Sequence, residues 1–251
     1  VNCRTSSTGL GEFAISLPSA RIEAREIPTH RELQAGTKVV VLGTGTPIPD
    51  AHRAGPSIAV IHKGNSYLFD AGAGAVRQAT IARYLYDIPS LYPSQICCVF
   101  LSHLHSDHTL DLSELAHTLW WRRRNPLLVW GPLGISRISS AITDMIAIDA
   151  DFRINGLQPV ANSEGFKIQD TTIEPGIILH RDDLQIEAFL ANHGDISPAY
   201  SFKIVTDDIS IVISGVMLLR KTTRVPDSPS KLSPACCSAF PTFILILYQN
   251  D

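Results

Sequence analysis

The chain has 251 residues, of which 45% are hydrophobic and 18% are charged, a balance typical of one globular domain with extensions. The formal net charge is −3, so no overall basic field favours nucleic acid as a partner. No segment reaches the roughly 18 uninterrupted apolar residues of a membrane helix, so we expect no membrane partner.

The cysteines are few and oddly placed. Cys3 stands alone, and the others form the adjacent pairs Cys97-Cys98 and Cys236-Cys237. This spacing is not that of a disulfide framework, and no CxxC pair is present to hold zinc. We therefore expect a reducing compartment and a cytoplasmic location. The amino terminus has no strong basic region, so we expect no signal peptide.

Several elements are predicted in the first part of the chain. Residues 1–36 are polar and irregular, which predicts an N-terminal extension before a domain at 37–216. KVVVLG at 38–43 is a buried-strand run, and a hairpin is predicted around Lys63-Gly64-Asn65. Residues 75–86 predict a helix.

The next elements surround a histidine-rich segment. QICCVFLS at 95–102 predicts a buried strand, and a helix is predicted at 109–121. A strand at 126–132, a helix from 135 to 147 and short strands at 160–214 follow. Strands and helices alternate early and hairpins dominate later, which predicts an α/β layered fold with mixed sheets.

The tail, residues 217–251, differs in composition. Four of its residues within 16 positions are prolines, from Pro226 to Pro241, and it contains no histidine. We expect this tail to be disordered, with a final apolar segment, PTFILILYQ, that forms a strand without a partner.

HLHSDH, residues 103–108, is the segment that carries chemistry. In an extended chain residues two apart point to the same side, so His103 and His105 can bind one ion. Asp107 and His108 follow where a helix begins, and can face a second ion. Neutral imidazole suits zinc, which lowers the pKa of a bound water to about 7 when one coordination position is open. The alternative is a histidine-rich surface loop that binds no metal.

HLHSDH resembles the HxHxDH signature of the metallo-β-lactamase fold. VVVLGTGTPIPD and YLFDAGAGAVRQ resemble the branch that contains tRNase Z and arylsulfatase-like hydrolases. The similarity runs from about Lys38 to Gly215. It implies a four-layer αββα sandwich with metals held at one edge by the loops between strands.

The resemblance also implies roles for single residues. His103 and His105 would bind the first zinc, and Asp107 and His108 would bind the second. Asp107 would also orient or deprotonate the attacking water, and is therefore the candidate catalytic residue. Asp70 matches an aspartate that supports the metal loops, although a polar residue at the end of a strand explains it equally well.

A third ligand for the first zinc is expected later in the chain. His193 follows an apolar strand and matches the position of that ligand in the family. His180 is its competitor, but it lies at a predicted hairpin turn and is expected to face solvent. His117, on the helix after the motif, is expected to be a packed or surface histidine, and three others are expected at the surface: His30, His52 and His62.

The resemblance stops at the end of IVISG. The family has an aspartate there that bridges both metals, whereas this chain has Val216, and no histidine follows His193. The second site would retain only Asp107 and His108, and two ligands hold zinc poorly. We therefore expect a sandwich that is incomplete at the C-terminus, with one zinc in place of two. A read-through intron, a natural truncated isoform and a diverged sequence all fit this change.

The sequence thus predicts a zinc-dependent hydrolase in which metal-bound hydroxide attacks a phosphate, sulfate or carboxylate ester of a small molecule. A tRNA 3′-end endonuclease is the alternative. It is not favoured, because no Gly/Pro-rich basic arm lies between Pro132 and His193. A non-catalytic truncated isoform is the hypothesis from another class, and a homodimer is left open. WWRRRNP at 120–126 could contact phosphates, but an exposed helix end explains it better.

Overall fold

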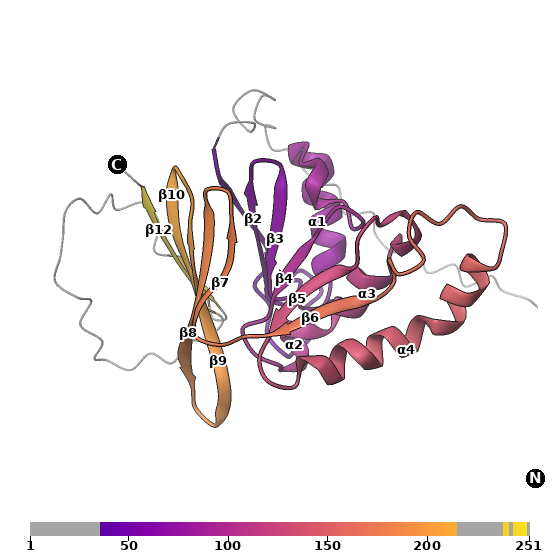
Figure 1. The fold of residues 1–251 in the computed structure, drawn as a ribbon. Coiled ribbons are helices and arrows are strands. Elements are labelled where there is room, and N and C mark those ends of the chain that lie inside the picture. The colour runs from indigo at the N-terminus through magenta and orange to yellow at the C-terminus, as the bar shows by residue number, and fades with distance from the viewer. Residues whose placement is uncertain (1–35, 215–237, 241–242, 250–251) are drawn as a thin grey trace, which may run out of the picture.

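The computed structural model describes residues 36–214, 238–240 and 243–249, which form two six-stranded sheets packed face to face (Figure 1). The first sheet has the strand order β1 (Lys38–Gly43), β2 (Ser57–His62), β3 (Asn65–Phe69), β4 (Cys98–Phe100), β5 (Leu127–Gly131) and β6 (Ile168–Thr172). The second has the order β11 (Ser238–Phe240), β12 (Phe243–Gln249), β10 (Ile209–Ser214), β9 (Ile196–Val205), β8 (Leu184–His193) and β7 (Gly176–Arg181).

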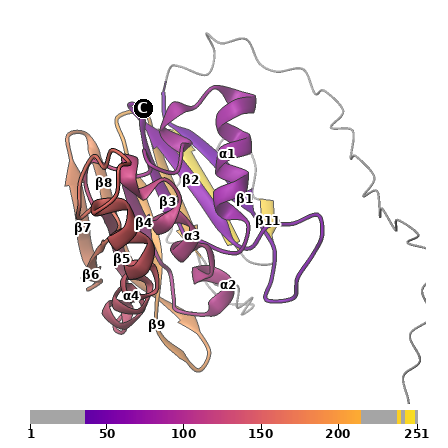
Figure 2. The same ribbon diagram turned by 90° about the vertical axis from the view of Figure 1, so that its right-hand side faces the viewer.

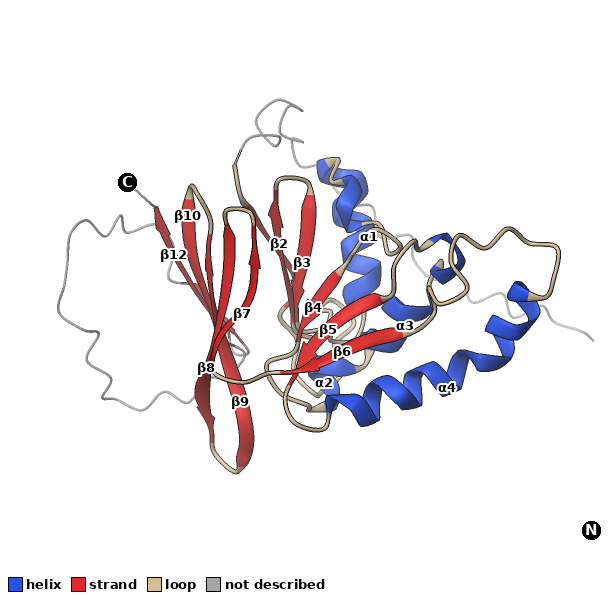
Figure 3. Ribbon diagram, in the orientation of Figure 1, coloured by secondary structure: helices blue, strands red, loops and turns tan. Residues whose placement is uncertain are grey.

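The helices lie on one side of the first sheet, and the second sheet lies on its other side (Figures 2 and 3). They are α1 (Ala75–Tyr86), α2 (Ser106–Thr109), α3 (Asp111–His117) and α4 (Ile135–Ile154), with 3₁₀ turns η1 (Pro89–Leu91) and η2 (Trp120–Arg122). β1, β2 and β3 pair antiparallel, whereas β3 to β6 run parallel. The carboxyl ends of β3 and β4 therefore meet at one edge, which is where the histidine-rich segment begins.

The alternation of buried residues along β2 explains this layering. Ile58 and Val60 join the core between the two sheets, whereas Ala59 and Ile61 join the core between the first sheet and the helices. All six residues of β2 are buried, as expected for a strand covered on both faces. Between the sheets, stacked rings extend this core: the centroids of Phe69 and Phe100 lie 5.2 Å apart.

The predicted fold class is confirmed as an α/β sandwich with mixed sheets, and its incompleteness at the C-terminus stays a prediction. Within the described ranges no helix covers the outer face of the second sheet, so three layers, α, β and β, are present (Figure 1). The fourth layer stays a prediction. The first strand, the hairpin and α1 match their predicted bounds. β4 is shorter than predicted, the helix predicted at 109–121 is present as α3 followed by the 3₁₀ turn η2, the short helix α2 before it was not predicted, and α4 extends beyond its predicted end.

The tail departs from its prediction in one respect. Residues 243–249 form a strand as expected, but it has a partner: β12 pairs antiparallel with β10 along its whole length. The expectation of an unpaired strand is therefore wrong for this segment, and the predicted disorder is wrong for residues 238–240, which form β11. Residues 1–35 and 215–237, with Val216 among them, lie outside the described part. The domain boundaries at 36 and 216 stay predictions.

One disulfide was not foreseen. Cys97 and Cys98 are bonded to each other. A bond between adjacent residues links no distant segments, so it is not a disulfide framework. The cytoplasmic location stays a prediction. In the part of the chain that the structure describes, no helix is long and apolar enough to cross a membrane.

Candidate metal centre

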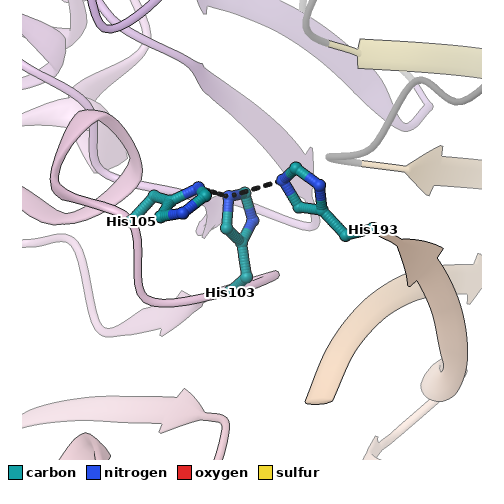
Figure 4. Close-up of side chains that lie close together, drawn as sticks. All are labelled: His103, His105 and His193. Atoms are coloured by element: carbon teal, nitrogen blue, oxygen red, sulfur yellow. Dashed lines mark hydrogen bonds between the residues drawn. The ribbon is translucent and has the colours of Figure 1, made fainter. Parts of the chain in front are cut away.

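Three histidines from different sheets meet at one edge of the sandwich (Figure 4). His103 and His105 lie in the loop between β4 and α2, and His193 ends β8, at the tip of the β8–β9 hairpin. The backbone N–H of Tyr200 on β9 donates a 2.8 Å hydrogen bond to the carbonyl of Ser102. This bond joins the second sheet to the loop that carries His103, so the hairpin tip is held over the same edge.

The nitrogen atoms of these histidines are spaced as ligands of one ion. His103 Nε2 lies 3.1 Å from His105 Nδ1 and 3.2 Å from His193 Nε2. One atom from each residue can be chosen so that all three lie within 4.8 Å of one another. Zinc–nitrogen bonds of about 2.0–2.1 Å in a tetrahedron place two ligand atoms roughly 3.3 Å apart. The three histidines therefore fit a tetrahedral metal ion with one position left open.

Burial keeps the first of these imidazoles neutral, the form that binds metals. His103 is 1% exposed, and its burial, with the nearby charge of His108, lowers its pKa to about 3. Burial also lowers the pKa of His193, and the charges of His105 and His108 add to this effect. His105 is exposed, so the cluster opens to solvent on its side.

Asp70 braces the loops around the cluster. Its Oδ1 accepts a 2.7 Å hydrogen bond from the backbone N–H of Ser102, and its Oδ2 accepts a 2.8 Å bond from the Ser102 hydroxyl. Oδ2 also lies 2.8 Å from His108 Nδ1. Asp70 is 1% exposed and has a φ of 60°, a backbone conformation that aspartate tolerates better than most residues. A supporting role explains this geometry better than an ordinary strand end does.

Gly72 allows the loop after Asp70 to pack against the histidine-rich segment. A Cβ at Gly72 would lie 2.4 Å from the carbonyl oxygen of Asp107 and 2.5 Å from the carbonyl carbon of Gly55. Backbone bonds close the same contact: the N–H of Ala71 donates to the carbonyl of His108 at 2.8 Å. The FDAGAG segment therefore needs glycine here for close approach, in addition to its turn.

Asp107 and His108 form a second, smaller group beside the three histidines. Both lie in α2 and are buried, and His108 Nε2 is 3.5 Å from Asp107 Oδ2. Burial alone would lower the pKa of His108, but the carboxylate of Asp70 outweighs this effect and raises it. His108 Nδ1 is held by Asp70, so its Nε2, which lies on the side of Asp107, is the atom that could face an ion.

Comparison with known proteins agrees with this geometry. Residues 65–216 match the family described as "Beta-lactamase superfamily domain". The chain belongs to the metallo-β-lactamase superfamily. It is 30% identical over 182 residues to a protein named ribonuclease Z from Mycolicibacterium gilvum, covering 71% of this chain and 60% of that one. A ribonuclease Z from a Mycobacterium species (strain KMS) is 29% identical over 181 residues, with the same coverage.

A solved structure agrees with the fold. Human tRNase Z, short form, superposes with a TM-score of 0.53 at 20% identity, covering 70% of this chain and 68% of that one. This likeness concerns the fold alone. The chain spans about 60% of the length of the curated relatives named above.

Metallo-β-lactamase folds imply a divalent metal, and the residues present fit the first site of a member of this superfamily. Of the ligands predicted from the sequence, His103, His105 and His193 are placed to bind one ion. Asp107 and His108 lie beside them. Their coordination of a metal stays a prediction. β10, which precedes Val216, ends at Ser214, whose hydroxyl accepts a 2.8 Å bond from Ser201 next to Tyr200. The described end of β10 is thus close to the loop that carries the cluster.

The remaining histidines lie away from this metal centre. His180 is exposed on β7, as expected. His117 packs between helices, with Nε2 3.0 Å from the carbonyl of Ile142, and His52 is exposed. The expectation of a surface position is wrong for His62, which is 4% exposed and lies 2.9 Å from Asp183. His30 lies outside the described residues.

A pocket beside Asp107 was not foreseen from the sequence. It has a volume of about 440 Å³, and Arg53 and Arg77 line it together with Asp50 and Glu114. The loop GTGTPIPDAHR contributes its Arg53, while Arg77 comes from α1. The density of Gly and Pro in this loop predicted a turn, but did not indicate that its arginine lies near the metal centre.

Proposed function

We propose that this chain forms the metal centre of a phosphodiesterase that uses zinc and acts on RNA. The observation that supports it is the convergence of His103, His105 and His193 from two sheets, with nitrogen spacings of 3.1 and 3.2 Å. The sequence indicated these residues, but favoured a small-molecule ester as substrate. Because of the similarity to proteins named ribonuclease Z, we favour RNA as the substrate over a small-molecule ester.

A divalent ion at the three histidines would polarise a phosphoryl oxygen and make water a better nucleophile at neutral pH. The chain's own residues would do the rest. Asp107 is 8% exposed and lines the adjacent pocket, so its carboxylate can take the proton of the attacking water. Asp70 holds His108 and the Ser102 backbone, which keeps the loop in one arrangement.

The pocket beside Asp107 supports a phosphate ester over a neutral one. Arg53 and Arg77 line it, and guanidinium groups bind phosphate oxygens in pairs. Its three acidic residues, Asp50, Asp107 and Glu114, outnumber the two arginines, so the pocket carries mixed charge and the arginines are its phosphate-binding groups. A sulfate ester satisfies the same contacts, so substrate assays must include one.

A non-catalytic protein is the second candidate, and Val216 favours it. Valine offers no metal ligand where the family has its bridging aspartate, and no histidine follows His193 in the sequence. On this hypothesis the chain binds one zinc and turns over no ester. Both candidates share the same first site and differ in activity alone.

The test is hydrolysis of a tRNA precursor, of bis(p-nitrophenyl) phosphate and of p-nitrophenyl sulfate by the full chain loaded with zinc. His193→Ala should abolish any activity, whereas His180→Ala, which changes an exposed histidine of the same sheet, should not. Cleavage of the precursor that is lost only in His193→Ala supports the proposal. Cleavage of the sulfate ester alone would overturn it.

An inert chain requires one more variant. Val216→Asp, joined to the histidine-containing C-terminal segment of a ribonuclease Z relative, restores the ligands that the family expects. Activity raised by orders of magnitude in the repaired chain would assign the inactivity to the missing ligands and support the non-catalytic candidate. A repaired chain that binds zinc but cleaves none of the three substrates would contradict a phosphodiesterase ancestry.

A further inference from the structure

A second pocket lies at the opposite edge of the first sheet from the metal centre. It has a volume of about 650 Å³ and is lined near the beginnings of β3, β4 and β5, by Asn65, Cys97 and Leu128 among others. Cys97 and His103 are six residues apart along the β4 segment, so the two sites are separated by at most about 20 Å along this path. No residue lines both this pocket and the pocket beside Asp107.

Its lining is strongly basic. Four arginines line it and no aspartate or glutamate does: Arg122, Arg123, Arg124 and Arg181. The neutral polar side chains that line it can all donate hydrogen bonds: Asn65, Ser94, Gln95, Asn125 and Gln169. In a chain with a net charge of −3, this concentration of positive charge is not a consequence of composition.

Arg123 fixes the segment that carries two of these charges. It is 3% exposed, and its guanidinium donates to the carbonyls of Ile96, Pro93 and Leu115 at 2.8, 2.9 and 2.9 Å. With Arg123 anchored, its neighbours Arg122 and Arg124 are both exposed and both line the pocket. The backbone is thereby held in place, so binding does not require this loop to be ordered first.

The unpaired charges of the exposed arginines indicate that the pocket is built for an anion. Within the described residues, Arg122, Arg124 and Arg181 form no ion pair with a carboxylate, so their charges are not neutralised by the protein. Arg181 Nη1 lies 4.0 Å from Cys97 Sγ, at the wall of the pocket.

We propose that this pocket binds the phosphate groups of a nucleotide or of an RNA backbone, at a site separate from the metal centre. Arginine forks match phosphate oxygens, and a volume of about 650 Å³ falls within the range of small-ligand pockets. The arginines do lie at an exposed helix end, since η2 ends at Arg122, but a 3₁₀ turn of three residues does not account for the presence of Arg124 and Arg181 in the same pocket. The proposal does not depend on hydrolysis, since the pocket shares no residue with the metal centre.

The test is binding to the full chain in EDTA, which removes any metal from the other site. The probes are inorganic pyrophosphate, adenosine 5′-monophosphate and a fluorescein-labelled RNA of about 12 nucleotides, titrated at several salt concentrations. The variant is Arg122→Gln with Arg124→Gln, because both side chains are exposed and their loss should not affect folding. Arg137→Gln with Lys203→Gln is the control, since both are exposed, lie outside the pocket and remove the same charge.

We expect the pocket variant to weaken binding about tenfold or more at low salt, and the control to leave it within about twofold. For RNA, the slope of log K against log salt should fall in magnitude by about 1.4, because two phosphate contacts are lost. Binding of the monophosphate and pyrophosphate identifies a nucleotide site, and binding of RNA alone identifies a backbone site. Equal affinities for the pocket variant and the control, or no binding of any probe to the unchanged chain, would overturn the proposal.

Discussion

The two groups of candidate metal ligands are assembled in opposite ways. His103, His105 and His193 come from segments 90 residues apart, and the hairpin of the second sheet must dock on the first before they meet. Asp107 and His108 are neighbours in α2, and Asp70 holds His108 from below. The second group is the better braced, yet it supplies only two side chains. How firmly a group is held and how many candidate ligands it supplies are therefore separate properties. The first group has three candidate ligands because two sheets contribute to it.

The largest expected effect is on the group that spans both sheets. His193→Ala removes the one candidate ligand that the described part of the second sheet contributes. Zinc affinity should therefore fall more than about 100-fold, the largest loss expected for a residue that only supports a ligand. His180→Ala is the matched control, because His180 is exposed on β7 of the same sheet. Titration with a competing zinc chelator measures both. Equal affinities in the two variants would show that the hairpin contributes no ligand.

Removing the brace should have a smaller effect. Asp70→Asn keeps the size of the side chain but removes the charge that faces His108 and weakens its bonds to Ser102. We expect zinc affinity to fall about 10- to 100-fold, as for other residues that orient ligands. Asp144→Asn, an exposed position on α4, should change nothing. If both substitutions leave zinc affinity unchanged, Asp70 does not support the metal ligands.

Close approach between the two loops gives the next prediction. Gly72→Ala places a methyl group 2.4 Å from the carbonyl oxygen of Asp107, so the backbone must shift. The free energy of unfolding in urea should fall by about 1–3 kcal/mol, and zinc affinity should fall with it. In Gly64→Ala the added Cβ has no atom within 4 Å, and only the left-handed turn is strained. This control should therefore lower stability without changing zinc affinity. If Gly72→Ala loses stability but keeps its zinc affinity, the close contact at Gly72 does not position the metal ligands.

The smallest effect distinguishes the two groups by pH in the metal-free protein. The folded pKa of His103 is about 3, below its unfolded value, so its contribution to stability is lost as pH falls below about 6.5. The folded pKa of His108 is raised, so its contribution is present below about 6.5 and lost as pH rises through the folded value. His108→Asn should therefore lose more stability than the unchanged chain when pH drops from about 7.5 to about 5.5. Urea unfolding at both pH values measures this; parallel losses would show that His108 is neutral in the fold.

Much of the first sheet could be predicted because its signals are local. The run KVVVLG, the turn at Lys63-Gly64-Asn65 and the helix at 75–86 each depend on residues close in sequence, and all three match the structure. The short helix α2 before the predicted helix was missed, because its segment contacts Ala71 and Asp70, which are distant in sequence. The pairing of β12 with β10 likewise depends on the sheet as a whole.

In the candidate site too, residues within one local motif could be predicted, and residues that depend on distant segments could not. His103, His105, Asp107 and His108 stand in one motif, so spacing was enough to select them. His193 required the resemblance to a family, because an apolar strand before a histidine does not by itself indicate a metal ligand. The buried position of His62 was missed because its partners, Thr37 and Asp183, are 25 and 121 residues away. Burial of a single polar residue depends on such distant contacts.

The central claim is that three histidines from two sheets bind one metal ion, and zinc content per chain tests it most directly. Elemental mass spectrometry on the purified full chain, compared with His103→Ala, gives this number. We predict close to one zinc per chain in the unchanged protein and almost none in the variant. No zinc in the unchanged chain, or an equal content in both proteins, would contradict the claim.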